Sequence, residues 1–349
     1  MTNPFAITFG IRPEQYIPRI EQREQIITDF NRVPAPTQAY MIIGVRGSGK
    51  TVILSEVSEK IGAEWIKIDL STQLDMLRSF TTQLYGEKSV HKLFVKANFD
   101  FSFMGLGIHT EVSDPAYDYQ TALSKMLTEI RKQNCRVLVT VDEVGNNENM
   151  RQFASVFQIL IRNRLPVFLL MAGIPENVYG LMNERTSTFL LRTPRILMTP
   201  LNYIMIKRSY LRELKVNEKT AEKLALMTKG YPFAFQALGY VCWGKPIDTD
   251  NDAFEEIISE YDYYLQEFSY MKLWEEMSEN DRKAARAIAL SEASDKVSDI
   301  REIAGMDSKF FGVYRDRLKK KGILDTSKYG RVAFSLPRFA EFIREMPEE

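Results

Sequence analysis

A glycine-rich octapeptide directly follows a short apolar run near the start of the chain. Residues 40–43 read Tyr-Met-Ile-Ile, and residues 44–51 read Gly-Val-Arg-Gly-Ser-Gly-Lys-Thr. The octapeptide matches the phosphate-loop pattern G-x-x-x-x-G-K-[ST] at every fixed position, and a helical pattern follows it. Such a loop requires a strand before it and a helix after it, so the motif predicts an α/β core that binds a nucleotide.

Each part of this loop has an expected role. Lys50 reaches the β- and γ-phosphates, and the Thr51 hydroxyl binds Mg²⁺. The backbone N–H groups of the loop and of the first helical turn close around the phosphates. The residues predicted to bind the nucleotide here are Gly44, Val45, Arg46, Gly47, Ser48, Gly49, Lys50, Thr51 and Val52. A chance glycine-rich turn is the alternative, and the patterns on either side of the loop argue against it.

A pair of acidic residues supplies the second half of the predicted site. The apolar run of residues 137–141 ends in Asp142 and Glu143, which places two carboxylates at the carboxyl edge of a sheet. Asp142 is expected to hold Mg²⁺ through water, and Glu143 is expected to be the general base that polarises the attacking water. A solvated acidic turn is the alternative, because apolar runs often end in Asp-Glu by chance.

Strand-like and helical patterns alternate through residues 1–200. The strand-like runs are 40–43, Trp65–Leu70, Arg136–Val141, 167–171 and 195–198, and the helical patterns are 19–30, 51–61, 72–85, 119–132, 149–164 and 177–183. This alternation is typical of a parallel sheet with helices on both faces. Residues 201–277 carry helical patterns only, which predicts an all-helical lid after a core of residues 1–200.

One segment interrupts the alternation. Phe99, Phe101 and Phe103 recur at period two and are followed by two glycines, which predicts a β-hairpin insertion over about residues 92–112. The hairpin either packs its phenylalanines onto the core as an edge or presents them as a contact surface for an apolar partner or DNA. The sequence leaves both interpretations open.

The last part of the chain, residues 278–349, has the order of a winged helix. Ser278 and Asp281 form a helix-cap pattern. Helical patterns cover 278–291, Val297–Ala304 and 309–320, and strand-like runs at 323–325 and 332–336 flank a turn. The residues expected to face double-stranded DNA on the recognition helix and wing are Ser308, Lys309, Arg315, Lys319, Lys328 and Arg331. Aspartates among them dilute the positive charge, and winged helices also dock proteins, so both kinds of partner stay open.

Composition and charge argue against several classes of protein. An apolar fraction of 45% and a charged fraction of 26% are typical of a soluble globular protein, and 46 basic residues balance 46 acidic ones. No overall positive field therefore attracts nucleic acid. Neither a signal peptide nor a membrane-spanning run is visible, which predicts a cytoplasmic protein with no membrane contact. Cys135 and Cys242 are expected to be reduced and buried, because their spacing suits neither zinc nor a disulfide framework.

Taken together, the motifs resemble those of AAA+/STAND-type P-loop ATPases. The resemblance is to the replication-initiator-like branch (origin-recognition and archaeal initiator ATPases) and to prokaryotic ATP-binding proteins with a C-terminal winged helix. It covers nearly the whole chain and rests on five segments: an N-terminal Asn-Pro-Phe, GVRGSGKT, VTVDEV, MAGIPENV and TKGYPFAFQALGY. It implies ATP or ADP as the ligand, with Mg²⁺, held between the core and the lid.

The lid segment Gly230-Tyr231-Pro232 resembles the Gly-x-Pro signature of STAND ATPases. The resemblance implies that Pro232 lies at the base or sugar of the nucleotide with Tyr231 close by. A proline that starts a helix is the alternative, and the two are compatible. By the same resemblance, Ile17 and Pro18 would line the adenine pocket.

Two features of initiator ATPases are missing. Residues 233–236 (Phe-Ala-Phe-Gln) stand where a lid helix usually carries a sensor arginine, and Gly173, Ile174 and Pro175 stand where the fourth strand usually ends in a polar sensor. These departures predict slow hydrolysis, and hence a nucleotide-controlled switch that positions the winged helix on DNA. Arg185 or Arg192 could serve as an arginine finger between copies of the chain, which would imply nucleotide-dependent self-association; ordinary surface arginines are the alternative. A STAND-like signalling ATPase, whose winged helix and hairpin bind protein, is the alternative function.

Overall fold

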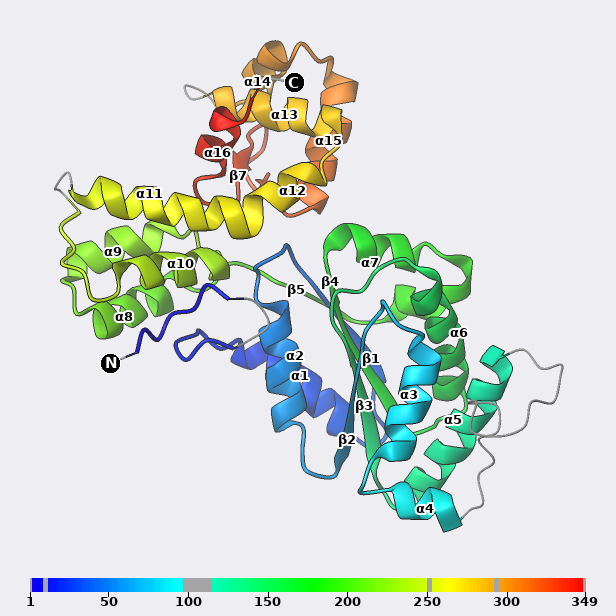
Figure 1. The fold of residues 1–349 in the computed structure, drawn as a ribbon. Coiled ribbons are helices and arrows are strands. Elements are labelled where there is room, and N and C mark those ends of the chain that lie inside the picture. Colours follow the sequence, from blue (N-terminus) through cyan, green and yellow to red (C-terminus); the bar gives the residue numbers. More distant parts are fainter. Residues whose placement is uncertain (1, 9–11, 97–114, 250–252, 292–294, 348–349) are drawn as a thin grey trace. The chain divides into compact units, whose positions relative to one another are not determined.

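The structure, a computed structural model, describes residues 2–8, 12–96, 115–249, 253–291 and 295–347. The chain divides into two compact units. The sheet unit comprises Arg19–Ile43 and Lys50–Leu197, and the helical unit comprises Met1–Pro18, Gly44–Gly49 and Met198–Glu349. The division passes through the glycine-rich loop, between Gly49 and Lys50. Figure 1 shows the elements of each unit.

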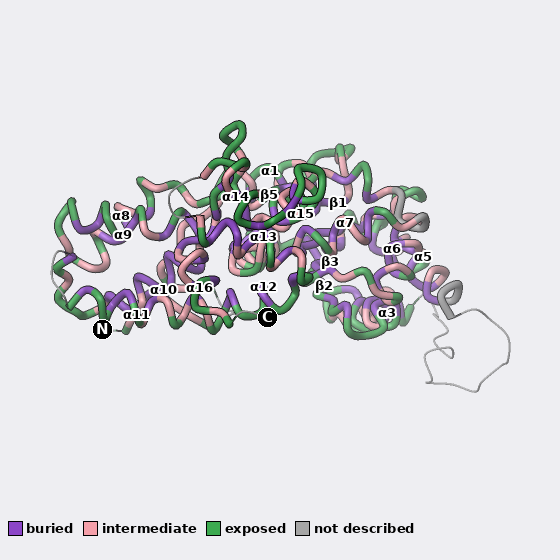
Figure 2. Tube along the Cα trace, turned by 90° about the horizontal axis from the view of Figure 1, so that it is seen from above, coloured by how far each residue is buried: buried purple, intermediate pink, exposed green. Residues whose placement is uncertain are grey.

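Within the described residues, the sheet unit holds one parallel sheet in the order β2-β3-β4-β1-β5. Its strands are β1 (Ala39–Ile43), β2 (Trp65–Leu70), β3 (Arg136–Val141), β4 (Val167–Gly173) and β5 (Arg195–Leu197). All residues of β1 and β4 are buried, as expected for continuous apolar runs that are covered on both faces. The central strands are accordingly purple in Figure 2. The predicted parallel sheet is confirmed.

Helices cover both faces of this sheet. They are α1 (Ile20–Asn31), α2 (Lys50–Lys60), α3 (Met76–Gly86), α4 (His91–Lys96), α5 (Pro115–Lys132), α6 (Glu148–Arg162) and α7 (Pro175–Met182), with a 3₁₀ segment η2 (Arg185–Arg192). Strand residues alternate between faces: Met41 and Val139 join the core formed with α3, α5 and α6. On the opposite face, the ring of Phe30 from α1 lies 5.7 Å from Tyr40 and 5.1 Å from Phe168.

Two local expectations differ from the structure. The helix expected from residue 72 begins at Met76, because the Asp75 side chain caps it by accepting a hydrogen bond from the Arg78 N–H. Residues 92–96 lie in helix α4 and not in a hairpin, since His91 Nδ1 and the Tyr85 carbonyl are 2.8 Å apart and tie this turn to α3. The rest of the predicted hairpin, residues 97–112, lies outside the described residues.

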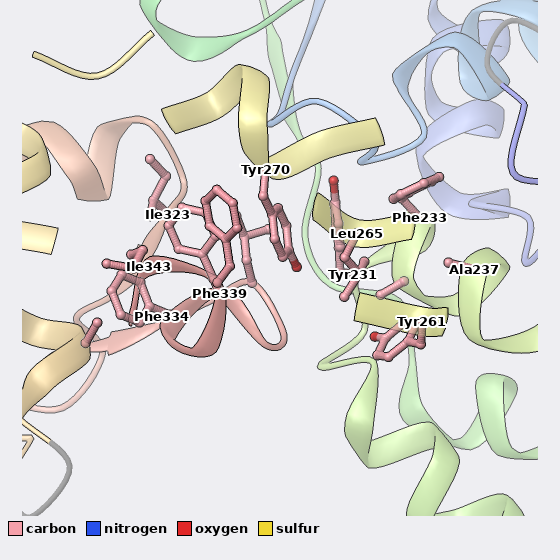
Figure 3. Close-up of a cluster of buried hydrophobic side chains, with 14 of the residues drawn as sticks. Tyr231, Phe233, Ala237, Tyr261, Leu265, Tyr270, Ile323, Phe334, Phe339 and Ile343 are labelled. Atoms are coloured by element: carbon pink, nitrogen blue, oxygen red, sulfur yellow. The ribbon is translucent and has the colours of Figure 1, made fainter. Parts of the chain in front are cut away.

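The helical unit is built on one continuous hydrophobic core. Its elements are α8 (Tyr203–Leu214), α9 (Glu218–Met227), α10 (Pro232–Cys242), α11 (Ala253–Leu265), a π-helical turn η3 (Gln266–Tyr270), α12 (Met271–Glu275), α13 (Glu279–Leu290), α14 (Val297–Ala304), α15 (Ser308–Lys320), β6 (Leu324–Asp325), β7 (Ala333–Phe334) and α16 (Phe339–Glu345). Figure 3 shows side chains from α10, η3 and α16 in this core. The expected lid and C-terminal module therefore share their buried residues.

The C-terminal module has the predicted order of three helices and a hairpin. Helix α13 starts with a complete capping box, in which the side chains of Ser278 and Asp281 each accept from the other's backbone N–H. Strands β6 and β7 pair antiparallel. Helix α16 follows the hairpin and was not predicted.

The N-terminal segment packs on α10, which the sequence did not predict. Phe5 is 2% exposed, and its ring meets Phe235 edge-on at 5.5 Å. A Cβ at Gly239 would lie 2.4 Å from the Phe5 ring, so this contact requires glycine. The Gln236 side chain accepts from the Ala6 N–H and donates to the Gln15 carbonyl. Residues before α1 are thus held to the lid.

Candidate nucleotide site

The glycine-rich loop connects β1 to α2, which begins at Lys50. Gly47 and Gly49 have left-handed backbones, with φ of +73° and +86°, which glycine adopts readily and other residues rarely do. Turns that alternate in this way direct consecutive N–H groups towards an anion. Gly44 is required for a different reason, because a Cβ there would lie 2.4 Å from Ser48 Oγ and 2.6 Å from Met198 Cβ.

Ser48 provides an independent sign of a ligand at the loop. The residue is 3% exposed, and its Oγ has no hydrogen-bond partner among the described residues. A buried hydroxyl without a partner costs about 1–3 kcal/mol. A phosphate oxygen in the loop would provide the missing acceptor.

Thr51 and Asp142 meet at the start of α2. The Thr51 hydroxyl donates to Asp142 Oδ2 at 2.5 Å, and Asp142 Oδ1 accepts from the Glu143 N–H at 2.8 Å. Asp142 follows β3, which is separated from β1 only by β4, so both residues come from the carboxyl edge of the sheet. The structure brings together the two residues predicted to bind Mg²⁺, and carboxylate and hydroxyl oxygens suit that ion.

Glu143 has the exposure that a general base needs. Its side chain is exposed and makes no hydrogen bond or ion pair with any other residue that the structure describes. Its backbone is left-handed, with φ +50°, a conformation that costs a non-glycine residue about 1–2 kcal/mol. The following N–H, of Val144, donates to the Ala172 carbonyl of β4 at 2.8 Å, so the sheet holds the turn in this shape.

Within the helical unit, the lid contacts the loop. Tyr231 Oη donates to the Arg46 carbonyl at 2.6 Å, and the Phe233 N–H donates to the Gly47 carbonyl at 3.2 Å. Pro232 is the first residue of α10 and lies 4.0 Å from the position that a Cβ on Gly49 would occupy. It therefore starts the helix and lies beside the loop, and its contact with a nucleotide stays a prediction.

For the other residues predicted to line the nucleotide site, the structure gives the degree of burial. Ile17 is partly buried against the core of the helical unit, and Pro18 is half-buried. Val52 is half-buried in the first turn of α2. Their contact with a nucleotide stays a prediction.

Comparisons with known proteins bear on the fold. The structure is similar to that of the ORC2 protein of Aeropyrum pernix, solved as ADPNP-ADP complexes, with a TM-score of 0.57 and 14% sequence identity over 97% of this chain and 96% of that one. The chain therefore shares the fold of that ORC2 protein. Weaker similarities link it to the Aeropyrum pernix ORC1 protein in complex with DNA (TM-score 0.44, 11% identity, 94% and 92% covered) and to a STAND protein with a tetratricopeptide repeat sensor from Pyrococcus horikoshii (TM-score 0.41, 14% identity, 97% and 44% covered).

Two sequence comparisons add little about function. Residues 268–343 match a family model described as a domain of unknown function (DUF8462). No curated protein matches the chain.

The residues predicted to stand at the two sensor positions belong to α10 and to the end of β4. Phe233, Phe235 and Gln236 are buried in α10, and Gln236 binds the N-terminal segment. The end of β4 continues through Ile174 into Pro175, which begins α7. Arg192 is exposed at the end of η2, and the side chain of Arg185 lies outside what the structure describes. The assignment of an arginine finger stays a prediction.

On the C-terminal module, α15 exposes a mixed surface of charged and apolar side chains. Lys309, Lys319 and Lys328 are exposed, whereas Arg315 pairs with Asp316 at 3.0 Å and Arg331 pairs with Asp295. Phe310 and Val313 are 42% and 52% exposed on the same helix, which the sequence analysis missed. Among the described residues, no helix is long and apolar enough to cross a membrane, and no cluster of three or more metal-binding side chains occurs.

Proposed function

We propose that the chain binds ATP or ADP with Mg²⁺ at the glycine-rich loop and hydrolyses ATP slowly. The observation that carries this proposal is the hydrogen bond between Thr51 and Asp142. The two residues are far apart in sequence, and they belong to two different motifs that were predicted to bind the same ion. Left-handed Gly47 and Gly49 and the unpartnered Ser48 hydroxyl support a phosphate in the loop.

Each side chain then has a defined task. Lys50 neutralises charge on the β- and γ-phosphates. Thr51 and Asp142 would hold Mg²⁺, which supplies further positive charge to the phosphate oxygens. Glu143 accepts a proton from the attacking water. Ile17, Pro18, Tyr231 and Pro232 lie in the helical unit and are proposed to contact the base and sugar.

The absence of both sensor residues favours a nucleotide-controlled switch over an ATPase with fast turnover. The backbone carbonyl and apolar groups at the end of β4 and the buried residues of α10 provide no positive charge for the γ-phosphate. Hydrolysis is therefore expected to be slow, and the bound nucleotide is expected to be read through the position of the C-terminal module. Localisation in the cytoplasm and nucleotide-dependent self-association, through Arg185 or Arg192, are part of the same proposal.

The proposed partner of the C-terminal module is double-stranded DNA, bound by a winged helix. Exposed Lys309 and Lys319 on α15 and Lys328 in the hairpin turn support phosphate contacts. A protein partner is the second candidate, favoured by exposed Phe310 and Val313, since aromatic and apolar side chains are typical of protein interfaces.

Calorimetry with ATP tests the nucleotide site. Lys50→Ala is expected to weaken ATP binding by about 100-fold or more, because it removes a charge-assisted contact with phosphate. Lys60→Ala is a matched control at the other end of α2, where the lysine is exposed, and it is expected to bind like the unmodified chain. Unchanged ATP affinity in Lys50→Ala would overturn the assignment of the site.

A further inference from the structure

Three residues of the glycine-rich loop are held by the rest of the helical unit. Tyr231 Oη donates to the Arg46 carbonyl at 2.6 Å, and the Phe233 N–H donates to the Gly47 carbonyl at 3.2 Å. Val45 packs against the C-terminal module, since a Cβ at Gly322 would lie 2.7 Å from Val45 Cγ1. The loop therefore contacts both the lid and the module that follows it.

The Tyr231 bond fixes the orientation of one particular peptide. In a trans peptide, the carbonyl oxygen and the next N–H point in opposite directions. A hydrogen bond that holds the Arg46 carbonyl towards Tyr231 therefore turns the Gly47 N–H away from the lid. That N–H is one of the backbone donors of the loop. A Cβ at Gly47 would lie 2.3 Å from Tyr231 Oη, so the hydroxyl can lie here only because residue 47 is glycine.

The same hydroxyl has a second partner. Tyr231 Oη and Ser269 Oγ are 2.8 Å apart in the buried interior. A phenol has one hydrogen, and Tyr231 donates it to Arg46, so Ser269 is the donor in this second bond. Burial raises the pKa of Tyr231, which keeps the phenol protonated and able to donate. Ser269 belongs to the π-helical turn η3, and such turns are frequent at functional sites.

The next residue continues the path into the C-terminal module. Tyr270 Oη donates to the Pro337 carbonyl at 2.5 Å, and its ring meets Phe339 edge-on at 4.9 Å. Figure 3 shows Tyr270 between Tyr231 and Phe339. Pro337 and Phe339 lie just before and at the start of α16. A path thus runs from Arg46 to α16 through hydrogen bonds and ring contacts, joined by the chain between Ser269 and Tyr270.

We propose that Tyr231 is a positioning residue that orients the Gly47 N–H for phosphate and reports the state of the loop through η3 to the C-terminal module. This inference rests on the proposed nucleotide site and adds how that site is coupled to the module. Phosphate that draws the Gly47 N–H shifts the Arg46 carbonyl with it, because the two belong to one rigid peptide. The shift changes the bond to Tyr231, and Ser269 and Tyr270 respond.

Tyr231→Phe tests the inference because it removes only the hydroxyl. Tyr210→Phe is a matched control. Like Tyr231, Tyr210 is buried in the helical unit and donates to a backbone carbonyl, that of Phe235 at 2.9 Å, but it does not contact the loop. Each protein is studied as the full chain by calorimetry and by hydrogen–deuterium exchange, with Mg²⁺ and either ADP or a non-hydrolysable ATP analogue.

The coupling predicts a specific exchange pattern. In the unmodified chain and in Tyr210→Phe, nucleotide is expected to change exchange severalfold in η3 and at residues 335–339. Tyr231→Phe is expected to bind nucleotide about 2- to 10-fold more weakly, as for the loss of one hydrogen bond, and to lose the exchange response at saturating nucleotide. A response that persists in Tyr231→Phe overturns the inference, and so does binding by the unmodified chain without any response in η3.

Hydrogen exchange measured without nucleotide separates this inference from the proposed function. Gly47→Ala places a Cβ 2.3 Å from Tyr231 Oη and is expected to raise exchange in η3. The rise is expected to be smaller in a Tyr231→Phe background, where the Cβ still meets Phe233 Cβ at 2.9 Å. If the unmodified chain binds no nucleotide in calorimetry, the proposed function fails, and this measurement still decides whether the loop and η3 are coupled. Equal exchange in η3 with and without Gly47→Ala would show that they are not.

Discussion

Glu143 combines a left-handed backbone with an exposed carboxylate. Its φ of +50° is maintained because the neighbouring Val144 N–H is paired with β4 and the Glu143 N–H itself is paired with Asp142. The strained residue thus lies next to the proposed Mg²⁺ ligand, and strain of this kind is often retained at functional sites. Glutamine has the same shape and no basic oxygen, so it can separate the backbone from the chemistry.

Glu143→Gln is expected to lower the rate of ATP hydrolysis by about 100-fold or more, the usual contribution of a general base. ATP binding is expected to stay within a few-fold, because the side chain is not a proposed ligand of the phosphates. Phosphate release measured together with calorimetry checks both. Glu148→Gln, at an exposed carboxylate that pairs with Arg151 in α6, is the control, and equal hydrolysis by Glu143→Gln and Glu148→Gln would remove Glu143 from the mechanism.

The two cysteines differ in burial, contrary to the expectation that both are buried. Cys242 is buried and Cys135 is only half-buried, and both are free. Burial raises the pKa of the Cys242 thiol to about 12, so the thiol stays protonated at pH 8 and is a poor nucleophile. Iodoacetamide is expected to modify Cys135 in the native chain and Cys242 only after denaturation, as intact mass spectrometry would show. Modification of both thiols in the native chain would contradict this burial.

At the scale of single elements, substitutions in α15 can decide whether the partner of the C-terminal module is DNA or a protein. If DNA binds, Lys309→Ala and Lys319→Ala are each expected to weaken binding and to reduce the slope of log K against log salt by about 1, because each removes one phosphate contact. A salt-dependent gel-shift titration with duplex DNA measures this. Lys283→Ala, at an exposed lysine of α13 in the same module, is the matched control and is expected to leave the slope unchanged.

The opposite outcome also has a structural explanation. No binding to duplex DNA at about 50 mM salt, where phosphate contacts are strong, with or without ATP, would favour the protein-binding alternative. Phe310 and Val313 would then be the residues to substitute, since their exposure on α15 is difficult to explain by packing within the module.

Elements with a local sequence signal could be predicted well. The phosphate loop, β2 and β3 follow from contiguous residues, and the carboxyl edge of a parallel sheet accounts for the pairing of Thr51 with Asp142. Helix α3 starts late because Asp75 is the better cap, a competition between two polar residues that periodicity does not resolve. The prediction that Tyr231 lies near the nucleotide rests only on the resemblance. Its bonds to Arg46 and Ser269 have no signature, because any backbone carbonyl can accept a buried hydroxyl.

At the scale of the whole molecule, the sequence divides the helices after residue 200 into a lid and a separate module, whereas the structure gives them one core. Tyr270 contacts Phe339 and Phe342, and Lys229 Nζ donates to the Phe334 carbonyl. These contacts join residues that are far apart in the chain. Sequence patterns identify the apolar face of each helix, and they do not specify which faces pack together, so a shared core could not be predicted.

A shared core predicts that lid and module unfold together. Phe339→Ala removes a fully buried ring from this core and is expected to lower the free energy of unfolding of the helical unit by about 3–5 kcal/mol. Hydrogen exchange at increasing urea concentration would follow each segment separately. The midpoints of α10 and α13 are expected to fall together, while that of β3 changes little. Phe153→Ala removes a ring that is 1% exposed in the core of the sheet unit. It is expected to lower the midpoint of β3 and to change those of α10 and α13 little. A fall in α13 with no change in α10 would instead support the independent lid and winged helix that the sequence suggests.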